Sequence, residues 1–222
     1  MATRLTLTFD NGPTAGVTDR VLDLLAERKL RTTFFVVGLR LRDPAGRALA
    51  ERAFAEGHWI GNHTLTHGVQ LGQTTEAGAP GTEIGAAQEL IGALAHPDRL
   101  FRPYGAGGVL DDDLLSAAAV RYLETGGYSC VLWSSVPGDW IPAVDWVERC
   151  LSDVRAQDWP LVVLHDVEGC ALARLPELLD RLAEMGIEPT QELPEACVPI
   201  RRGVVRGPLD HLVKRAQPRS GW

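Results

Sequence analysis

Two histidines four residues apart, His63 and His67, are the side chains of this sequence best suited to hold a metal ion. Imidazole nitrogens bind transition metals, and a metal with an open coordination position can activate water for hydrolysis. A zincin-type metalloprotease has the same spacing but needs a glutamate after the first histidine, where this chain has Thr64. Taken alone, the pair is also compatible with two histidines on a turn and helix surface.

Several other polar residues fall at or just after the end of an apolar run: Asp10, Arg102, Asp139 and His165. Amide hydrolysis needs an activated water, a stabilised oxyanion and a proton for the leaving nitrogen. An aspartate and a histidine on opposite sides of a metal can supply the two proton transfers. Each residue also has an ordinary structural interpretation: a turn at residues 10–13, an ion pair between Arg102 and Asp139, and a core histidine at 165.

Short apolar runs typical of strands alternate with helical patterns along the chain. We expect strands at residues 5–9, 32–37, 58–61, 100–102, 129–133, 161–164 and from 187. We expect helices at residues 18–29, 44–56, 82–95, 111–119, 143–157 and 171–185. This alternation predicts an α/β fold with a parallel sheet inside a layer of helices. Because the polar residues follow so many different strands, a distorted (β/α)7-type barrel is favoured over an open doubly wound sheet.

The length of 222 residues suits a single domain, which we place at residues 1–200. Residues 201–222 carry six basic residues against Asp210, whereas the whole chain has a net charge of −7. We therefore expect a basic C-terminal tail that is solvated or docks on the acidic body. Nucleic-acid binding is not expected, because this tail has no interleaved aromatic residues and no known binding motif.

Composition narrows the class of protein further. Hydrophobic residues make up 45% and charged residues 23% of the chain, as in an ordinary globular protein. No apolar run reaches the roughly 18 residues of a membrane span, so no membrane contact is expected. A signal peptide has no room before the first predicted strand, which favours a cytoplasmic location. The four cysteines show no CxxC pair, so we expect reduced thiols rather than disulfides or a cysteine-rich zinc site.

Five short motifs follow one another along the chain: Thr8-Phe9-Asp10-Asn11-Gly12-Pro13, His63-Thr64-Leu65-Thr66-His67, Arg102-Pro103-Tyr104-Gly105, Val136-Pro137-Gly138-Asp139-Trp140 and Leu164-His165-Asp166. In this order they resemble the polysaccharide deacetylase family, also called NodB-homology domains, and the resemblance covers about residues 5–190. The first motif has asparagine at position 11 where the family usually has aspartate, and the third is one residue shorter than usual. The fourth lacks its usual leading aspartate, while the second and fifth are intact.

This resemblance implies a metal-dependent hydrolase that removes an N-acetyl or other N-acyl group from an amino sugar or a related small amide. It implies that His63, His67 and Asn11 hold the metal. It also implies that Asp10 is the base that deprotonates the attacking water and that His165 is the acid that protonates the leaving amine.

The resemblance assigns supporting roles to further residues. Arg102 would pair with Asp10, because a nearby cation favours an ionised carboxylate. Asp139 would orient His165 and raise its pKa. The backbone N–H of Tyr104 would stabilise the oxyanion. Pocket walls for the acyl methyl group would come from Trp140, Leu164 and Pro103.

Asn11 brings no charge to the proposed metal, so we expect weaker binding than at a His₂Asp site and a more acidic bound water. We expect one divalent cation, Zn²⁺ first, with Co²⁺, Ni²⁺ or Mn²⁺ as alternatives. The expected partner is an oligosaccharide or small-molecule substrate, and the oligomeric state is left open. Two other functions stay open: a metal-independent amide hydrolase resembling the allantoinase-like branch, and a non-catalytic protein that binds carbohydrate.

Overall fold

The apolar runs form one nine-stranded sheet in the computed structural model, which describes residues 4–214. Its central strands are parallel, because helical crossovers connect them. Alternation sets the faces of the first strand: Leu5, Leu7 and Phe9 pack toward the helices, while Asp10 lines the pocket inside the sheet. The parallel strands are β1 (Leu5–Asp10), β2 (Thr33–Val36), β3 (Trp59–Asn62), β4 (Leu100–Phe101), β6 (Ser129–Cys130) and β7 (Leu161–His165).

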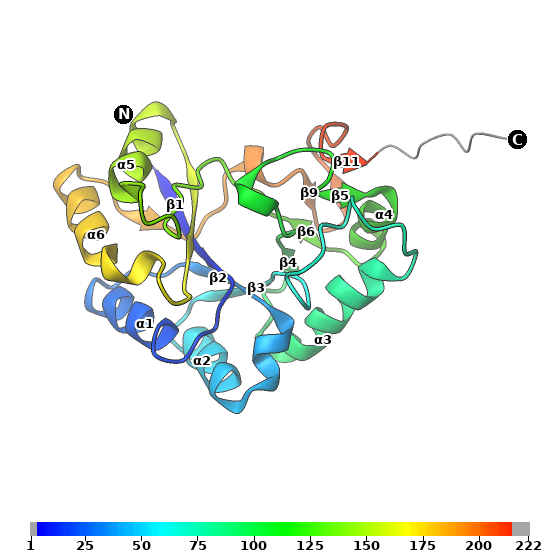
Figure 1. Ribbon diagram of the computed structural model, residues 1–222, viewed down its shortest axis with the longest axis horizontal. Coiled ribbons are helices and arrows are strands. Elements are labelled where there is room, and N and C mark those ends of the chain that lie inside the picture. The colour runs from blue at the N-terminus through cyan, green and yellow to red at the C-terminus, as the bar shows by residue number, and fades with distance from the viewer. Residues whose placement is uncertain (1–3, 215–222) are drawn as a thin grey trace, which may run out of the picture.

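Within the described residues, six α-helices lie outside the curved sheet (Figure 1). Each presents an apolar stripe to the sheet; in α6, for example, Leu175, Leu178, Leu179 and Leu182 are buried at helical spacing. The helices are α1 (Thr18–Glu27), α2 (Pro44–Ala55), α3 (Ala86–Ile91), α4 (Ala117–Thr125), α5 (Trp146–Ala156) and α6 (Leu175–Glu184). Short 3₁₀ turns occupy Gly38–Arg42, Gly92–Leu94, Ala106–Gly108, Ala171–Ala173 and Glu195–Cys197.

The expected distorted barrel is confirmed, but continuous strand pairing does not close it within residues 4–214. The strand order is β10-β9-β6-β4-β3-β2-β1-β7, and the short β8 (Pro189–Thr190) pairs with β1. The two sides meet where Ser135, after β6, forms a bridge to Val162 of β7. The N–H of Val163 donates to the carbonyl of Ser135 at 3.0 Å. A single bridge therefore takes the place of a ladder at this seam.

The helix predicted at residues 111–119 begins only at Ala117. Ser116 caps it by accepting a hydrogen bond from Ala119 N–H at 3.1 Å. The residues before it form a turn and β5 (Leu115–Ser116), which pairs with β11 (Val213–Lys214). Asp113 contacts Lys214 at 2.7 Å, so the acidic run binds a distant lysine instead of starting a helix.

The domain boundary predicted at residue 200 is wrong for the first part of the supposed tail. β9 (Ile200–Arg201) pairs with β6, and β10 (Val204–Val205) pairs with β9. Leu212 is buried in the core. Arg202 and Lys214 do contact acidic residues of the body, Asp98 at 2.8 Å and Asp113 at 2.7 Å. The remainder of the predicted tail, residues 215–222, lies outside the described residues.

The helix predicted at residues 82–95 is broken into pieces. It starts with a π-helical turn at Gly81–Gly85, continues as α3 and ends in the 3₁₀ turn Gly92–Leu94. A π turn shifts the side chains before it relative to the helix that follows, and such turns are frequent at functional sites. Between residues 4 and 214, we find no helix with the length and apolar character to cross a membrane.

Gly61 links strand packing to the polar residues inside the sheet. A Cβ at this position would lie 2.5 Å from Cδ1 of Phe35, and the Arg102 guanidinium lies 4.0 Å from the centre of the same ring. Strand β3 is extended here, so an alanine lacks space rather than a suitable backbone conformation.

We expect Gly61→Ala to lower the free energy of unfolding by about 1–3 kcal/mol, because the Phe35 ring must move against Arg102. Chemical denaturation measures this loss. Gly78→Ala is the matched control: no atom of the described part of the chain lies within 4 Å of its Cβ position, so a change within about 0.5 kcal/mol is expected. Equal stability of the Gly61 variant and wild type would show that this packing does not matter.

Candidate active site

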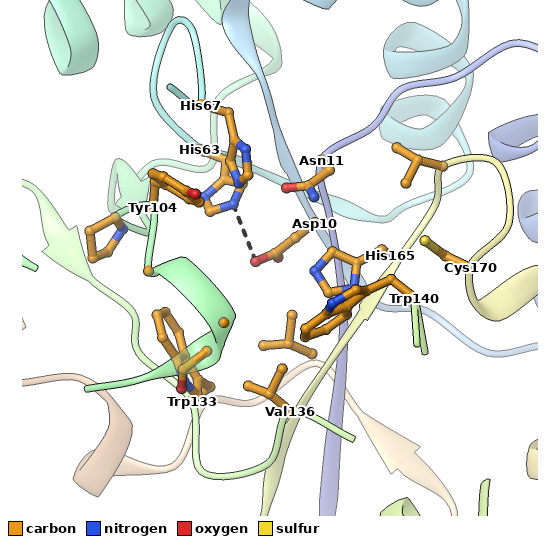
Figure 2. A pocket seen from close by; sticks show the side chains of 16 residues that line it. Asp10, Asn11, His63, His67, Tyr104, Trp133, Val136, Trp140, His165 and Cys170 are labelled. Carbon is orange, nitrogen blue, oxygen red and sulfur yellow. Dashed lines mark hydrogen bonds and ion pairs between the residues drawn. The ribbon is translucent and has the colours of Figure 1, made fainter. Parts of the chain in front are cut away.

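A pocket of about 270 Å³ opens at the carboxyl ends of the strands (Figure 2). It forms there because parallel strands present their following loops on one side of the sheet. Eight of the residues singled out from the sequence line it: Asp10, Asn11, His63, His67, Pro103, Tyr104, Trp140 and His165. Arg102 and Asp139 are buried behind this lining, and the side chain of each forms an ion pair with one lining residue, Asp10 and His165 respectively.

Arg102 is fully buried behind the pocket lining and forms an ion pair with Asp10. Its Nη1 donates to Asp10 Oδ1 at 2.7 Å and to Thr8 Oγ1 at 2.8 Å, and its Nε donates to the Val131 carbonyl at 3.2 Å. Burial lowers the pKa of Arg102, and the Asp10 carboxylate opposes that effect. A guanidinium stays charged in proteins, so the contact is an ion pair. It leaves Asp10 Oδ2 on the side of His63, 3.5 Å from Nε2.

His63 is held in the tautomer that a metal ligand needs. Its Nδ1 lies 2.9 Å from the carbonyl oxygen of Arg102. Because a carbonyl only accepts hydrogen bonds, Nδ1 carries the proton and Nε2 keeps a free lone pair. Burial lowers the pKa of His63, with Asp10 opposing, so the neutral ring prevails.

His67 lies beside His63, with ring centres 4.8 Å apart, and beside Tyr104, with ring centres 4.2 Å apart. Burial, followed by the neighbouring His63, lowers the pKa of His67 to about 3. A neutral imidazole is the form that binds metal. Two neutral histidines therefore face one side of the pocket.

Asn11 offers the third donor. Its Oδ1 is buried and has no hydrogen-bond partner within the described chain, and Figure 2 shows its amide turned toward the two imidazoles. A buried carbonyl oxygen without a partner costs about 1–3 kcal/mol, which a bound cation would remove. Among residues 4–214, no three histidine, cysteine, aspartate or glutamate side chains are arranged as a metal site. The donors that line this side of the pocket are two imidazoles and one amide oxygen, a set that suits a divalent transition metal.

His165 faces Asp10 from the neighbouring strand. Its Nδ1 lies 2.7 Å from Asp139 Oδ1, and its backbone N–H donates to Asp139 Oδ2 at 2.9 Å. Burial alone would lower the pKa of His165, but the hydrogen bond and charge of Asp139 outweigh it and raise that pKa. Asp10 and His165 are direct partners in the parallel pairing of β1 and β7. A carboxylate and a protonatable imidazole thus lie side by side, as Figure 2 shows.

The prediction that Leu164 lines the pocket is wrong. Leu164 is fully buried in the core beneath the outer helices. Side chains alternate along a strand, so Val163 shares the face of His165 and lines the pocket instead. The period of two along β7, counted back from His165, is the sequence signal for Val163.

Several pocket residues were not expected from the sequence, among them Trp133, Val136 and Cys170. Trp133 donates its Nε1–H to the Gly108 carbonyl at 2.9 Å, which ties the loop after Tyr104 to the wall. All four cysteines lie in the described range and are free; Cys170 is only half-buried, whereas the other three are buried. Trp140 places its ring edge-on to His165, with centres 4.9 Å apart.

Comparison with known proteins places this site among related sequences. The family model described as polysaccharide deacetylase matches residues 2–123. A peptidoglycan-N-acetylglucosamine deacetylase of Bacillus cereus is 33% identical over 190 residues, which cover 82% of this chain and 83% of that protein. A chitooligosaccharide deacetylase of Sinorhizobium fredii is 34% identical over 167 residues, covering 74% and 71%.

Solved structures show the same similarity in three dimensions. A family 4 carbohydrate esterase from Streptomyces lividans, solved with acetate, has a TM-score of 0.71 at 26% identity, covering 90% of this chain and 96% of that one. A family 4 acetyl xylan esterase from Clostridium thermocellum, solved with a cobalt ion, has a TM-score of 0.68 at 26% identity, covering 84% and 87%. Sequence and fold agree, and this chain belongs to the polysaccharide deacetylase family.

Proposed function

We propose that this protein is a metal-dependent hydrolase that removes the N-acetyl group from an amino sugar. One observation carries the proposal. Neutral His63 and His67 lie on one side of Asp10 together with the Asn11 amide oxygen, which has no hydrogen-bond partner among residues 4–214, and His165 lies on the other side. The relatives named for deacetylation of peptidoglycan N-acetylglucosamine and of chitooligosaccharides support an amino-sugar substrate. The alignments cover 83% and 71% of the length of these two relatives.

His63, His67 and Asn11 are the residues that would hold the cation. When bound, a divalent cation supplies Lewis-acid activation of the acyl carbonyl and makes a water more acidic. We propose Zn²⁺ as the resident ion, and the cobalt ion in the C. thermocellum relative supports a site that accepts several divalent metals.

Asp10 and His165 divide the two proton transfers between them. Asp10, fixed through one oxygen by Arg102, takes the proton of the attacking water at Oδ2. His165 has Nδ1 bound to Asp139, so Nε2 is the atom that protonates the leaving nitrogen. The backbone N–H of Tyr104 is the proposed donor to the oxyanion, and Trp140, Val163 and Pro103 surround the space for the acyl methyl group.

Metal content tests the proposal directly. Elemental analysis of the wild type after Zn²⁺ loading should give about one ion per chain, and His63→Ala should lose it. Chelation should abolish release of acetate from N-acetylated chito-oligosaccharides. Hydrolysis that survives chelation would instead support the metal-independent branch. Metal binding without turnover on any acylated amino sugar would support the non-catalytic alternative.

Asn11→Asp should bind Zn²⁺ about 10–100-fold more tightly, because the carboxylate adds a negative charge at ligand distance. Asn11 has a φ of 74°, a conformation that aspartate also adopts, so the substitution should preserve the turn. A competition titration with a chromophoric chelator measures the affinity, with Asn11→Ala as the variant that should bind more weakly. Unchanged affinity in both variants would place residue 11 outside the metal site.

Asp139→Asn should move the alkaline limb of the kcat/KM profile to lower pH. His165 must be protonated to act as an acid, so activity falls as pH rises through its pKa, which Asp139 raises. Removing that charge lowers the pKa of His165 and brings the loss of activity to a lower pH. Asp145→Asn, at an exposed residue of the same loop, should leave the profile unchanged. The same limb in wild type and Asp139→Asn would exclude His165 as the titrating acid.

A further inference from the structure

Two buried carboxylates lie outside the pocket lining yet contact the turns that carry the proposed ligands. Glu83 is 5% exposed and Asp166 is 1% exposed. A buried carboxylate is stable only when its oxygens accept hydrogen bonds. Here the donors belong to the turn between His63 and His67 and to the turn that follows Asn11.

Glu83 holds the middle of the histidine turn. Its Oε2 accepts the backbone N–H groups of Leu65 and Thr66, at 3.1 and 3.0 Å, and its Oε1 accepts the Thr66 hydroxyl at 2.9 Å. Glu83 comes from the π-helical turn Gly81–Gly85 ahead of α3. Glu83 thus accepts three hydrogen bonds, which tie the π turn to the segment between the two histidines.

The histidine turn has a backbone shape that needs outside support. Thr64 and His67 both have left-handed φ values, 65° and 54°. This region is unfavourable for residues other than glycine, and most of all for a β-branched threonine. The turn makes two local bonds, from Thr64 N–H to Asn62 Oδ1 and from His67 N–H to Thr64 Oγ1, both at 3.0 Å. Glu83 supplies the acceptors for the two N–H groups between them.

Asp166 holds the other ligand turn. Its Oδ1 accepts the Gly12 N–H at 3.0 Å, and its Oδ2 accepts the Thr18 hydroxyl at 2.6 Å. Thr18 Oγ1 in turn accepts the N–H of Thr14 at 2.7 Å, which leaves the hydroxyl proton for Asp166. A Cβ on Gly12 would overlap the Asp166 carboxyl group, so this close approach requires glycine beside Asn11.

We propose that Glu83 and Asp166 are positioning residues for the divalent metal, each holding one ligand-bearing turn in its binding shape through hydrogen bonds. The ligands come from two separate turns, so affinity depends on both turns being fixed before the ion arrives. This inference rests on the proposed function, because it takes His63, His67 and Asn11 as the ligands.

The test is the Zn²⁺ affinity of the full chain, measured by competition with a chromophoric chelator. Glu83→Ala and Asp166→Ala should bind Zn²⁺ about 10–100-fold more weakly. Glu83→Gln and Asp166→Asn should stay within about threefold of wild type. Their amide oxygen can accept the same backbone N–H groups, and their NH₂ can donate to the hydroxyl of Thr66 or Thr18.

Glu83→Asp separates position from charge, and it serves where an alanine variant does not fold. It keeps the negative charge but withdraws the carboxylate by one methylene, so it should weaken Zn²⁺ binding where Glu83→Gln does not. Glu89→Ala changes an exposed glutamate on helix α3, which directly follows the π turn of Glu83; it is the matched control and should bind as wild type does.

Two different results would overturn the inference, and they are distinguishable. A wild-type protein that binds no Zn²⁺ would contradict the proposed metal-dependent function and, with it, the proposed roles of Glu83 and Asp166. Wild type that binds Zn²⁺ and loses it in His63→Ala, beside Glu83→Ala and Glu83→Asp variants of unchanged affinity, would overturn the positioning role alone. Glu83→Gln as weak as Glu83→Ala would also overturn it, because charge rather than hydrogen bonding would then set the affinity.

Discussion

The buried ion pair between Arg102 and Asp10 is the interaction on which the rest of the site depends. A guanidinium without water is stable only if its N–H groups are bonded and its charge is matched. Here the partners come from β1 and from the residues after β6, and the Phe35 ring covers one face. The carbonyl of Arg102 also sets the tautomer of His63. One residue therefore positions the proposed base and prepares a proposed ligand, and neither role survives if the strands around it shift.

The strand ends and their polar residues could be predicted from the sequence, because parallel strands bring their carboxyl ends to one side of the sheet. Predictions failed where a distant partner decides the local structure. The acidic run before α4 resembles a helix start, but Lys214 pairs with Asp113 about a hundred residues away. The basic residues after 200 resemble a tail, but Ile200 and Leu212 enter the core. The prediction that Leu164 lines the pocket was wrong by one position, because a shift of one residue along a strand moves the side chain to the opposite face of the sheet.

The residues that hold the turns were harder to find than the residues that line the pocket. Glu83 lies in a segment of helical pattern and nothing near it in sequence indicates what it contacts. Its role depends on hydrogen bonds from a turn 17 and 18 residues earlier in the chain, and its side chain is buried within a π turn. Asp166 lies beside a motif histidine, but its partners Gly12 and Thr18 are about 150 residues away. Spacing rules address neighbours along one element, and these contacts join different elements.

The separation between the proposed base and acid is a property of the sheet rather than of either side chain. Asp10 and His165 are paired residues on adjacent parallel strands, so their backbones are about 4.8 Å apart by strand spacing alone. Their partners then divide the chemistry: Asp10 contacts a cation, whereas His165 contacts the carboxylate that raises its pKa. A base must be free of its proton and an acid must carry one at the same pH. Arg102 beside Asp10 and Asp139 beside His165 give these two neighbouring positions opposite electrostatic surroundings, which a single shared environment could not provide.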